Sequence, residues 1–395
     1  MIERALVIGS MNCMPTEYAL LLKDHCREVV HYYDAADSDS LSNPRIRWGA
    51  ASRKRTEGII IRKMYVRHYL SFLLPRLLHQ NLLNEMENAD LILLSGPAIS
   101  LASHIPLGKK TIIGLSYGGD VSIFCDREWP HKALPNARNM RGLIASQLKA
   151  LKAKFVELQI AGLRSCTHYS YFIPGFDTKT DALLDEVLAG SGAKVRLPRY
   201  SIGLDLLEYE VGTKLSSHAD KYKILFPVRF CEDELFGDKG WRLLFEGLRR
   251  FKQERKTEFV CICFEKGNYH AARSYAAELG LGDVIEWHRV VPFNTLVQYY
   301  HAADVVVEQL GSHWIAQGLF AMALGKPVIG RLSTPAQRAF FVGSGLLSIE
   351  NVDSYVDFLV QCESESFRAE VGLRSRAFVP ARAAIAPEFL SWGVT

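Results

Sequence analysis

The hydrophobic residues of this chain gather in short runs that alternate with longer helical patterns. The runs predict buried strands at Ala5–Gly9, Val29–Tyr33, Leu91–Gly96, Thr111–Ser116, His168–Pro174, Lys223–Phe230, Phe259–Phe264, Val284–Val290, Val305–Leu310 and Pro327–Leu332. Helices are predicted between the later runs, at Trp241–Gln253, Tyr269–Leu279 and Gly318–Leu324. Nearly continuous apolar strands separated by helices are typical of parallel sheets covered on both faces. Because the series occurs twice, we expect an α/β protein of two doubly wound, Rossmann-like domains, with a boundary near residues 204–217.

The length of 395 residues suits two domains of ordinary size. We place them at residues 1–204 and 205–375, and expect residues 376–395 to form a helical segment that packs back toward the N-terminal domain. Hydrophobic residues make up 48% and charged residues 23% of the chain, which excludes a disordered, collagen-like or small disulfide-stapled protein. The net charge of +4 does not call for a nucleic-acid partner.

Neither the first residues of the chain nor its cysteines indicate secretion. The start, Met1–Gly9, lacks the basic region and the long apolar run of a signal peptide, and no stretch approaches the ~18 apolar residues of a membrane span. The eight cysteines form no C-x-x-C pair and mostly lie in apolar runs. We expect buried, reduced thiols, no metal site, and a cytoplasmic protein.

Two loops after predicted strands of the first half carry candidate chemistry, because ligands bind at the carboxyl ends of parallel strands. The first is Gly9-Ser10-Met11-Asn12, which lacks the G-x-G-x-x-G fingerprint of dinucleotide binding. The second is Tyr117-Gly118-Gly119-Asp120, whose glycines permit close backbone approach. Asp120 at a strand end could act as a base or bind a hydroxyl group; the alternative is a helix N-cap.

A basic stretch runs from Arg45 to Arg76, with Glu57 as its single acid. Its cations are Arg45, Arg47, Arg53, Lys54, Arg55, Arg62, Lys63, Arg67 and Arg76, and aromatic and aliphatic residues are interleaved with them. The pattern is compatible with a surface that contacts anionic lipid headgroups at the inner face of the plasma membrane, or with a simple solvated basic face. Nucleic acid is disfavoured because no nucleic-acid-binding motif accompanies the charge.

The clearest chemistry lies in the second half. Arg229 ends a predicted strand, and Lys239 and Gly240 come directly before the helix predicted at Trp241–Gln253. Two cations and the positive end of a helix dipole can converge on one point, which predicts a phosphate or diphosphate site. Ion pairs with neighbouring acids are the alternative role for these cations.

The segment from about Arg199 to Gly330 resembles the nucleotide-binding half of the retaining "group 1" glycosyltransferases of GT-B fold. The residues that carry the resemblance are Arg229, Lys239-Gly240, Tyr300–Asp304 and Ala321–Ile329. The resemblance implies a fold of two Rossmann-like domains facing one cleft. It also implies transfer of a sugar, with retention, from a nucleotide-diphosphate sugar to an acceptor hydroxyl on a glycan, a lipid-linked molecule or a small molecule, in the assembly of cell-surface polysaccharide or glycoconjugates.

The same resemblance implies roles for individual residues. Arg229 and Lys239 would hold the donor diphosphate, Val291 and Pro292 would lie near the base, and cations would replace a metal, so no cofactor is expected. Residues of the loop that starts at Glu308 would approach the donor sugar, namely Gln309, Gly311, Ser312, His313 and Trp314. The acceptor would enter on the N-terminal side, near Gly9, Ser10, Asn12, Tyr117 and Asp120. For catalysis the candidates are Asp120, Glu308 and His313.

One position departs from the family pattern. The family has a Glu directly before Ala-Met-Ala, where it binds the ribose, and this chain has Phe320 there. The family's partner Glu falls at Ser312. A phenyl ring cannot accept hydrogen bonds from ribose hydroxyls, and Glu308 is the nearest acid that could take over; Glu308-Gln309 looks like the variant found in one subgroup. Two alternatives follow: a GT-B epimerase or hydrolase of sugar nucleotides, and a non-catalytic GT-B binding protein.

Overall fold

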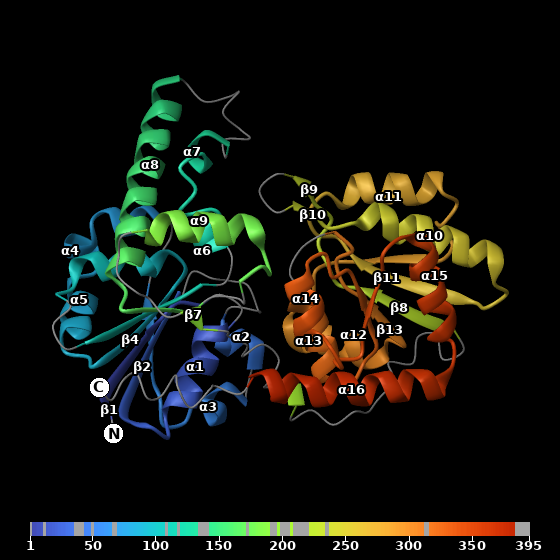
Figure 1. Cartoon of the computed structure of the whole chain (residues 1–395), viewed down its shortest axis with the longest axis horizontal. Helices are drawn as coiled ribbons and strands as arrows, with labels where there is room; N and C mark the ends of the chain where they lie inside the picture. Colours follow the sequence, from blue (N-terminus) through green and yellow to red (C-terminus); the bar gives the residue numbers. More distant parts are fainter. Residues whose placement is uncertain are drawn as a thin grey trace. The chain divides into compact units, whose positions relative to one another are not determined.

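The computed structural model describes residues 2–10, 13–34, 43–48, 51–64, 69–106, 110–116, 119–132, 142–170, 174–189, 196–197, 206–207, 221–233, 237–311 and 316–383. By its internal contacts the chain divides into two compact units (Figure 1). Unit 1 comprises Met1–Ser201 and Ile385–Thr395, and unit 2 comprises Ile202–Ala384. The boundaries predicted from the sequence lie after residues 204 and 375. Helix α16 (Glu365–Ala383) runs through the second of these positions without a break.

Unit 1 is built on a seven-stranded parallel sheet of order β3-β2-β1-β4-β5-β6-β7. Its strands are β1 (Ile2–Ile8), β2 (Cys26–Asp34), β3 (Ile60–Met64), β4 (Leu91–Ser95), β5 (Thr111–Leu115), β6 (His168–Ser170) and β7 (Arg196–Leu197). Its helices are α1 (Met14–Leu22), α2 (Pro44–Trp48), α3 (Ser52–Arg55), η3 (Tyr69–Leu73), α4 (Pro75–Leu78), α5 (Gln80–Glu87), η4 (Gly96–His104), α6 (Gly119–Ser122), α7 (Trp129–Lys132), α8 (Gly142–Ser165) and α9 (Thr178–Leu188), where η marks a 3-10 helix.

Unit 2 is built on a six-stranded parallel sheet of order β12-β11-β8-β13-β14-β15. Its strands are β8 (Tyr222–Phe226), β11 (Phe259–Phe264), β12 (Ile285–His288), β13 (Val305–Val307), β14 (Val328–Gly330) and β15 (Leu346–Ser348), and a short antiparallel pair, β9 (Glu232–Asp233) and β10 (Gly237–Asp238), follows β8. Its helices are α10 (Trp241–Glu254), α11 (Tyr269–Glu278), α12 (Phe293–Ala302), α13 (Ala316–Ala323), α14 (Pro335–Phe340), α15 (Val352–Gln361) and α16.

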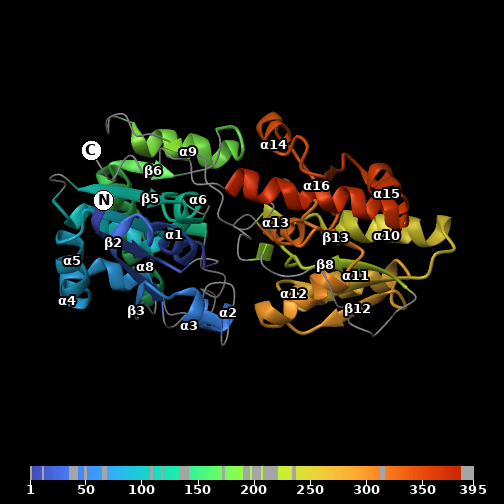
Figure 2. The same ribbon diagram turned by 90° about the horizontal axis from the view of Figure 1, so that it is seen from below.

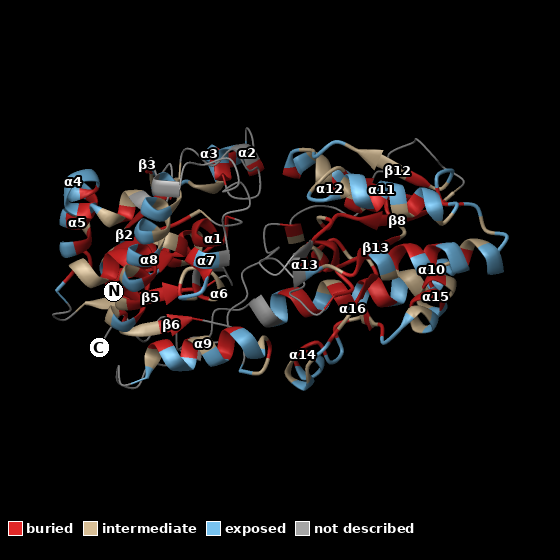
Figure 3. Ribbon diagram, turned by 90° about the horizontal axis from the view of Figure 1, so that it is seen from above, coloured by how far each residue is buried: buried red, intermediate tan, exposed pale blue. Residues whose placement is uncertain are grey.

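The central strands of both sheets are buried because helices flank each sheet (Figures 1 and 2). Every residue of β4, β8 and β11 is buried, and Figure 3 shows β8 in the red interior of its unit. Burial on both faces explains why these strands appear in the sequence as unbroken apolar runs rather than as alternating patterns. The predicted class, two doubly wound α/β domains, is confirmed.

Strand β3 was not predicted. Its sequence, Ile60-Ile61-Arg62-Lys63-Met64, lies inside the basic stretch, and only Met64 of the five is buried. The strand forms the edge of its sheet and pairs only with β2 among the described strands. An edge strand tolerates charged side chains, so hydrophobicity alone does not mark it.

Candidate functional site

The topology of unit 2 picks out one point on its sheet. From β8 the chain moves to β11 on one side, and it later returns to β13 on the other side, so β8 and β13 are neighbours with the order reversing between them. In an open parallel sheet, ligands bind beyond the carboxyl ends of the strands at such a switch point. The loops after β8 and β13 carry Arg229, Lys239, Glu308, Gln309 and Gly311, so the structure brings the loops of these five predicted residues to one edge of one sheet.

The loop after β8 is fixed on its β11 side by the backbone. The N–H of Phe230 donates to the carbonyl of Lys266 at 3.0 Å, and the N–H of Asn268 donates to the carbonyl of Phe230 at 2.7 Å. Arg229 lies between Val228 and Phe230, which are both buried, whereas Arg229 is half-buried. The guanidinium group is therefore carried by an anchored backbone at the strand end.

Lys239 is fixed on the β13 side. Its N–H donates to the carbonyl of Cys231 at 3.1 Å, and its carbonyl accepts the N–H of Leu310 at 2.9 Å. The next residue, Gly240, has a φ of 71° and caps the N-terminus of α10 without a side-chain hydrogen bond. Its own N–H donates to Asp238 Oδ1 at 2.7 Å.

The two loops touch through a pair of glycines. A Cβ added at Gly240 would lie 2.4 Å from the Gly311 nitrogen, and one added at Gly311 would lie 1.8 Å from the Asp238 carbonyl oxygen. No side chain fits at either position without moving a backbone. Gly240 and Gly311 were singled out in the sequence for other reasons, and their contact was not predicted, because the two residues are distant along the chain.

Helix α10 supplies a positive end to this site. It runs for 14 residues, and its cap residue, Gly240, has no side chain to occupy the first-turn N–H groups. The unpaired N–H groups and the aligned peptide dipoles of a helix N-terminus attract anions. With Lys239 directly before the helix, this corner of unit 2 has the character of a phosphate site.

Glu308, directly after β13, is buried and holds the start of α13. Its Oε1 accepts the N–H of Gln309 at 3.0 Å, and its Oε2 accepts the N–H of Gly318 in the first turn of α13. Burial raises the pKa of the Glu308 carboxyl from 4.5 to about 7, against the opposing effect of these N–H groups and of the positive charge of Lys239. The N-terminus of α13 therefore has a buried carboxylate of the chain itself as a hydrogen-bond acceptor.

Helix α12 is tied to the same region. The hydroxyl of Tyr300, in α12, donates to Gln317 Oε1 in α13 at 2.6 Å. Tyr300 is fully buried, and burial, together with the charge of Glu308, raises the pKa of its phenol. The hydroxyl therefore stays protonated and serves as a fixed donor between the two helices.

Phe320 occupies the position where the family resemblance expected a ribose-binding Glu. Its side chain is buried, and its ring packs edge-to-face on Phe293 of α12, with ring centroids 5.1 Å apart. The residue is part of the core of unit 2. A phenyl ring has no atom that accepts hydrogen bonds from ribose hydroxyls, so the residue at this helix position does not bind a ribose.

The predicted base-contacting residues lie further along the sheet. Val291 and Pro292 follow β12, and β11 separates β12 from β8. Two strand spacings amount to about 10 Å. Pro292 is exposed and caps α12, and the next residue, Phe293, is the one that contacts Phe320.

Unit 1 has its own switch point between β1 and β4. Gly9 follows β1 with a φ of 138°, and its N–H donates to the carbonyl of Tyr32 at 2.9 Å. A Cβ at Gly9 would lie 2.2 Å from Ser95 Oγ at the end of β4, so the position requires glycine. Ser10 follows, and its carbonyl accepts the N–H of Cys13 at 3.0 Å.

Several predicted site residues cannot be placed. Asn12, Tyr117, Ser312, His313 and Trp314 lie outside the described residues, and so does the side chain of Asp120. The backbone of Asp120 forms the second residue of α6, which begins at Gly119.

Metal ligands and membrane spans were also sought in the described part of the chain. Those residues contain no cluster of three or more His, Cys, Asp or Glu side chains that could hold a metal ion. The described cysteines are all buried and unpaired with one another by disulfides. None of the described helices is both long and apolar enough to cross a membrane.

The sequence matches no protein-family model and no curated relative. The structure is similar over nearly its whole length to solved structures. Anabaena HepE in complex with UDP-glucose has a TM-score of 0.60 at 13% identity and covers 100% of this chain and 99% of its own. Sucrose-phosphate synthase from Thermosynechococcus elongatus has a TM-score of 0.59 at 12% identity, and the match covers 99% of this chain and 96% of the synthase chain.

A third similar structure has a different activity in its description. A putative UDP-N-acetylglucosamine 2-epimerase from Listeria monocytogenes has a TM-score of 0.52 at 15% identity and covers 96% of this chain and 93% of its own. At these identities the likeness establishes the fold. The predicted GT-B fold class is confirmed: two Rossmann-like α/β domains, shared with glycosyltransferases and with enzymes of sugar-nucleotide epimerisation.

Proposed function

We propose that this chain is a glycosyltransferase that moves a sugar from a nucleotide-diphosphate sugar to an acceptor hydroxyl. The observation that supports the proposal is that the loops carrying Arg229 and Lys239, together with the N-terminus of α10, lie at the switch point of unit 2. Structures with this fold include complexes with UDP and with UDP-glucose, which supports a nucleotide sugar as the ligand.

In the proposed reaction the diphosphate leaves the sugar while unit 2 binds it. The guanidinium of Arg229 can donate two parallel hydrogen bonds to phosphate oxygens, and the ammonium of Lys239 acts as a compact charge. Together with the dipole of α10 they stabilise the negative charge that develops as the glycosidic bond breaks. These groups can do the work of a metal ion, so we expect a metal-independent reaction.

The finer parts of the proposal follow the family resemblance. We propose retention of the anomeric configuration, with the departing phosphate helping to take the proton of the acceptor hydroxyl. The acceptor would bind to the loops of unit 1 that hold Gly9 and Ser10, and Asp120, Glu308 and His313 stay the candidates for catalysis. The proposed setting is the assembly of cell-surface polysaccharide or glycoconjugates.

A second candidate is an epimerase or hydrolase that acts on a sugar nucleotide without an acceptor. The likeness to the Listeria epimerase structure, and to a Staphylococcus aureus MnaA structure with UDP bound, favours this candidate over other non-transferase activities. A third is a non-catalytic binding protein, which Phe320 supports because it removes the expected ribose ligand.

The test is incubation of the purified protein with UDP-, GDP-, dTDP- and CMP-sugars, followed by thermal stability and product analysis. For the transferase we expect stabilisation by at least one donor and sugar transfer only with an acceptor. Turnover without acceptor supports the epimerase or hydrolase, and stabilisation by none of the donors supports the binding protein.

Site variants make the same test specific to the proposed diphosphate clamp. Arg229→Ala and Lys239→Ala should each lower turnover on the order of 10²-fold or more. The control is Lys256→Ala. This exposed lysine comes just before β11 and therefore lies at the amino ends of the strands, away from the carboxyl ends where the candidate site is. Turnover unchanged in both site variants removes Arg229 and Lys239 from the proposed role.

A further inference from the structure

The part of unit 1 around α4 exposes an unusual group of leucines. Leu74, Leu77 and Leu78 are 56%, 77% and 55% exposed, although they lie within five consecutive residues. The described chain exposes nine large hydrophobic side chains in all, so one third of them lie in this leucine patch. Exposed hydrophobic residues scattered singly need no explanation, but a group of them on one element indicates a contact surface.

The patch is held rigidly rather than left on a loose loop. Pro75 and His79, which lie next to the patch residues, are buried, and the ring of His79 stacks on buried Phe72 of η3 at 5.3 Å between centroids. Burial lowers the pKa of His79, so this contact carries no charge at neutral pH. The leucines project from a fixed base.

Basic side chains lie on the same side of unit 1. Figures 2 and 3 show α2, α3, β3 and α4 along one side of the unit, the side of edge strand β3, with α9 at the opposite side. Exposed residues on these elements include Arg45, Arg53, Lys54, Lys63 and Arg76, and Ile60 on β3 is 41% exposed. Against these five cations, the sequence from Arg45 to Arg76 has Glu57 as its single acid.

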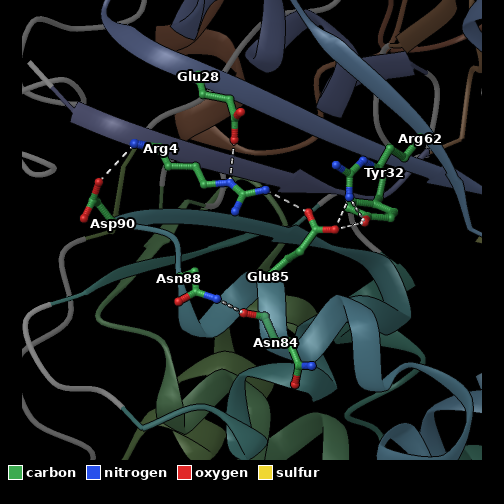
Figure 4. A network of polar contacts seen from close by, with 8 residues as sticks. All are labelled: Arg4, Glu28, Tyr32, Arg62, Asn84, Glu85, Asn88 and Asp90. Atoms are coloured by element: carbon green, nitrogen blue, oxygen red, sulfur yellow. Dashed lines mark hydrogen bonds and ion pairs between the residues drawn. The ribbon is translucent and has the colours of Figure 1, made fainter.

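Two cations of the basic stretch are paired with acids, so their charge is compensated within the fold. Arg62 pairs with Glu85 of α5 and donates to the Tyr32 hydroxyl, in a network of polar contacts that also includes Arg4 (Figure 4). Arg47 is buried, with its Nη2 3.6 Å from Glu17 Oε1. The stretch is therefore not one uniform basic face: part of it stabilises the fold, and its exposed cations lie along the side of unit 1 that carries α2, α3, β3 and α4.

We propose that the β3 side of unit 1 docks on an anionic lipid surface, with the leucine patch entering the headgroup region and the exposed arginines and lysines binding lipid phosphates. Charge complementarity selects this partner: the described exposed residues of α2, α3, β3 and α4 include five cations and no acid, so these elements are repelled by an identical copy of themselves but attracted to an anionic membrane. Apolar side chains and cations on the same side of a protein are the combination that binds at the interface of a bilayer. The surface belongs to unit 1 and shares no residue with the donor site of unit 2, so failure of either proposal leaves the other standing.

Vesicle co-sedimentation tests the proposal directly. The full chain is mixed with vesicles of phosphatidylcholine alone, or with roughly one-third phosphatidylglycerol. We expect binding to the anionic vesicles to exceed binding to the neutral ones at least about tenfold, and to fall with added salt. Equal binding to both kinds of vesicle, or to neither, overturns the proposal.

A pair of matched variants assigns the binding to the patch. Leu77→Ser/Leu78→Ser should lower vesicle binding at least about tenfold, because it removes the apolar part of the contact. The control is Leu373→Ser, which alters a leucine that is 73% exposed on α16 of unit 2 and should leave binding unchanged. Unfolding temperatures verify that both variants are folded.

Two results would contradict this assignment. One is equal binding by the double variant and the wild type, and the other is an equal loss in Leu373→Ser. Sedimentation velocity tests whether a second copy of the chain covers the leucine patch instead of a membrane. A dimer that forms with the wild type but not with the double variant, together with no vesicle binding, would identify the second copy.

Discussion

Replacing Glu308 with Gln tests the electrostatics of the candidate site at a buried carboxyl group. The carboxyl lies at the end of β13, and burial raises its pKa from 4.5 to about 7 in the folded protein. The difference corresponds to about 3 kcal/mol between the two protonation states. The Glu308→Gln substitution keeps the shape of the side chain but removes its ability to ionise.

The sign of the effect follows from proton binding. Between pH 4.5 and about 7 the folded protein holds a proton on Glu308 that the unfolded chain has released. The contribution of this group to stability is therefore fully present below pH 4.5 and is lost as pH rises through about 7. Because Gln does not titrate, the stability of Glu308→Gln relative to wild type should increase by about 3 kcal/mol from pH 4.5 to 8.

Glu308→Gln also lowers stability by an amount that does not depend on pH. In the wild type both carboxylate oxygens accept backbone N–H groups, from Gln309 and Gly318. The amide nitrogen of Gln cannot accept, so one of these N–H groups loses its partner at every pH, at a cost of about 1–3 kcal/mol. The slope of the difference, rather than its absolute value, carries the prediction.

The assay is urea denaturation of both proteins at several pH values, followed by circular dichroism. Taking the difference between the two proteins cancels the titration of all other groups. Glu278→Gln, which makes the same charge change on the exposed face of α11, is the control. Parallel curves for wild type and Glu308→Gln across this pH range would refute the account of Glu308 as a buried, readily protonated carboxyl.

Two further predictions concern other buried positions. Burial lowers the pKa of His31 from 6.5 to about 4, so wild-type stability should fall by about 3 kcal/mol as pH drops through that window, and His31→Gln should flatten the dependence in thermal melts; an unchanged acid sensitivity would count against it. Gly240→Ala should lower the free energy of unfolding, measured with denaturant, by several kcal/mol. The new Cβ would lie 2.4 Å from the Gly311 nitrogen, at a residue whose φ of 71° is already unfavourable for alanine. Gly280→Ala, at a φ of 70° with nothing within 4 Å, is its control and should cost about 1–2 kcal/mol; equal losses would show that the contact with Gly311 is unimportant.

The sequence predicted the strands of both sheets best where they are buried. The run Phe259–Phe264 was predicted with the same bounds that β11 has, because a strand covered on both faces is apolar at every position. The edge strand β3 was missed, because its mixture of charged and apolar residues resembles a solvated basic segment.

The candidate site was predicted in its residue types but not in its contacts. Arg229 and Lys239 could be assigned to a strand end and a helix start because both positions are local features of the sequence. The role of Glu308 at α13 could not be assigned, since the burial that raises its pKa comes from elements distant in the chain.

The sequence by itself determined the buried strands and several of the helices between them, and with these the class of fold, because each of these elements depends on a pattern within about ten residues. Only the tertiary structure decided which loops touch, as at Gly240 and Gly311, and which charges are buried, as Arg47 is, or remain exposed beside the leucines, as Arg76 does. The physical reason is that burial, close contact and shifted pKa values depend on neighbours in space, and parallel sheets place residues side by side that lie many tens of positions apart in the chain.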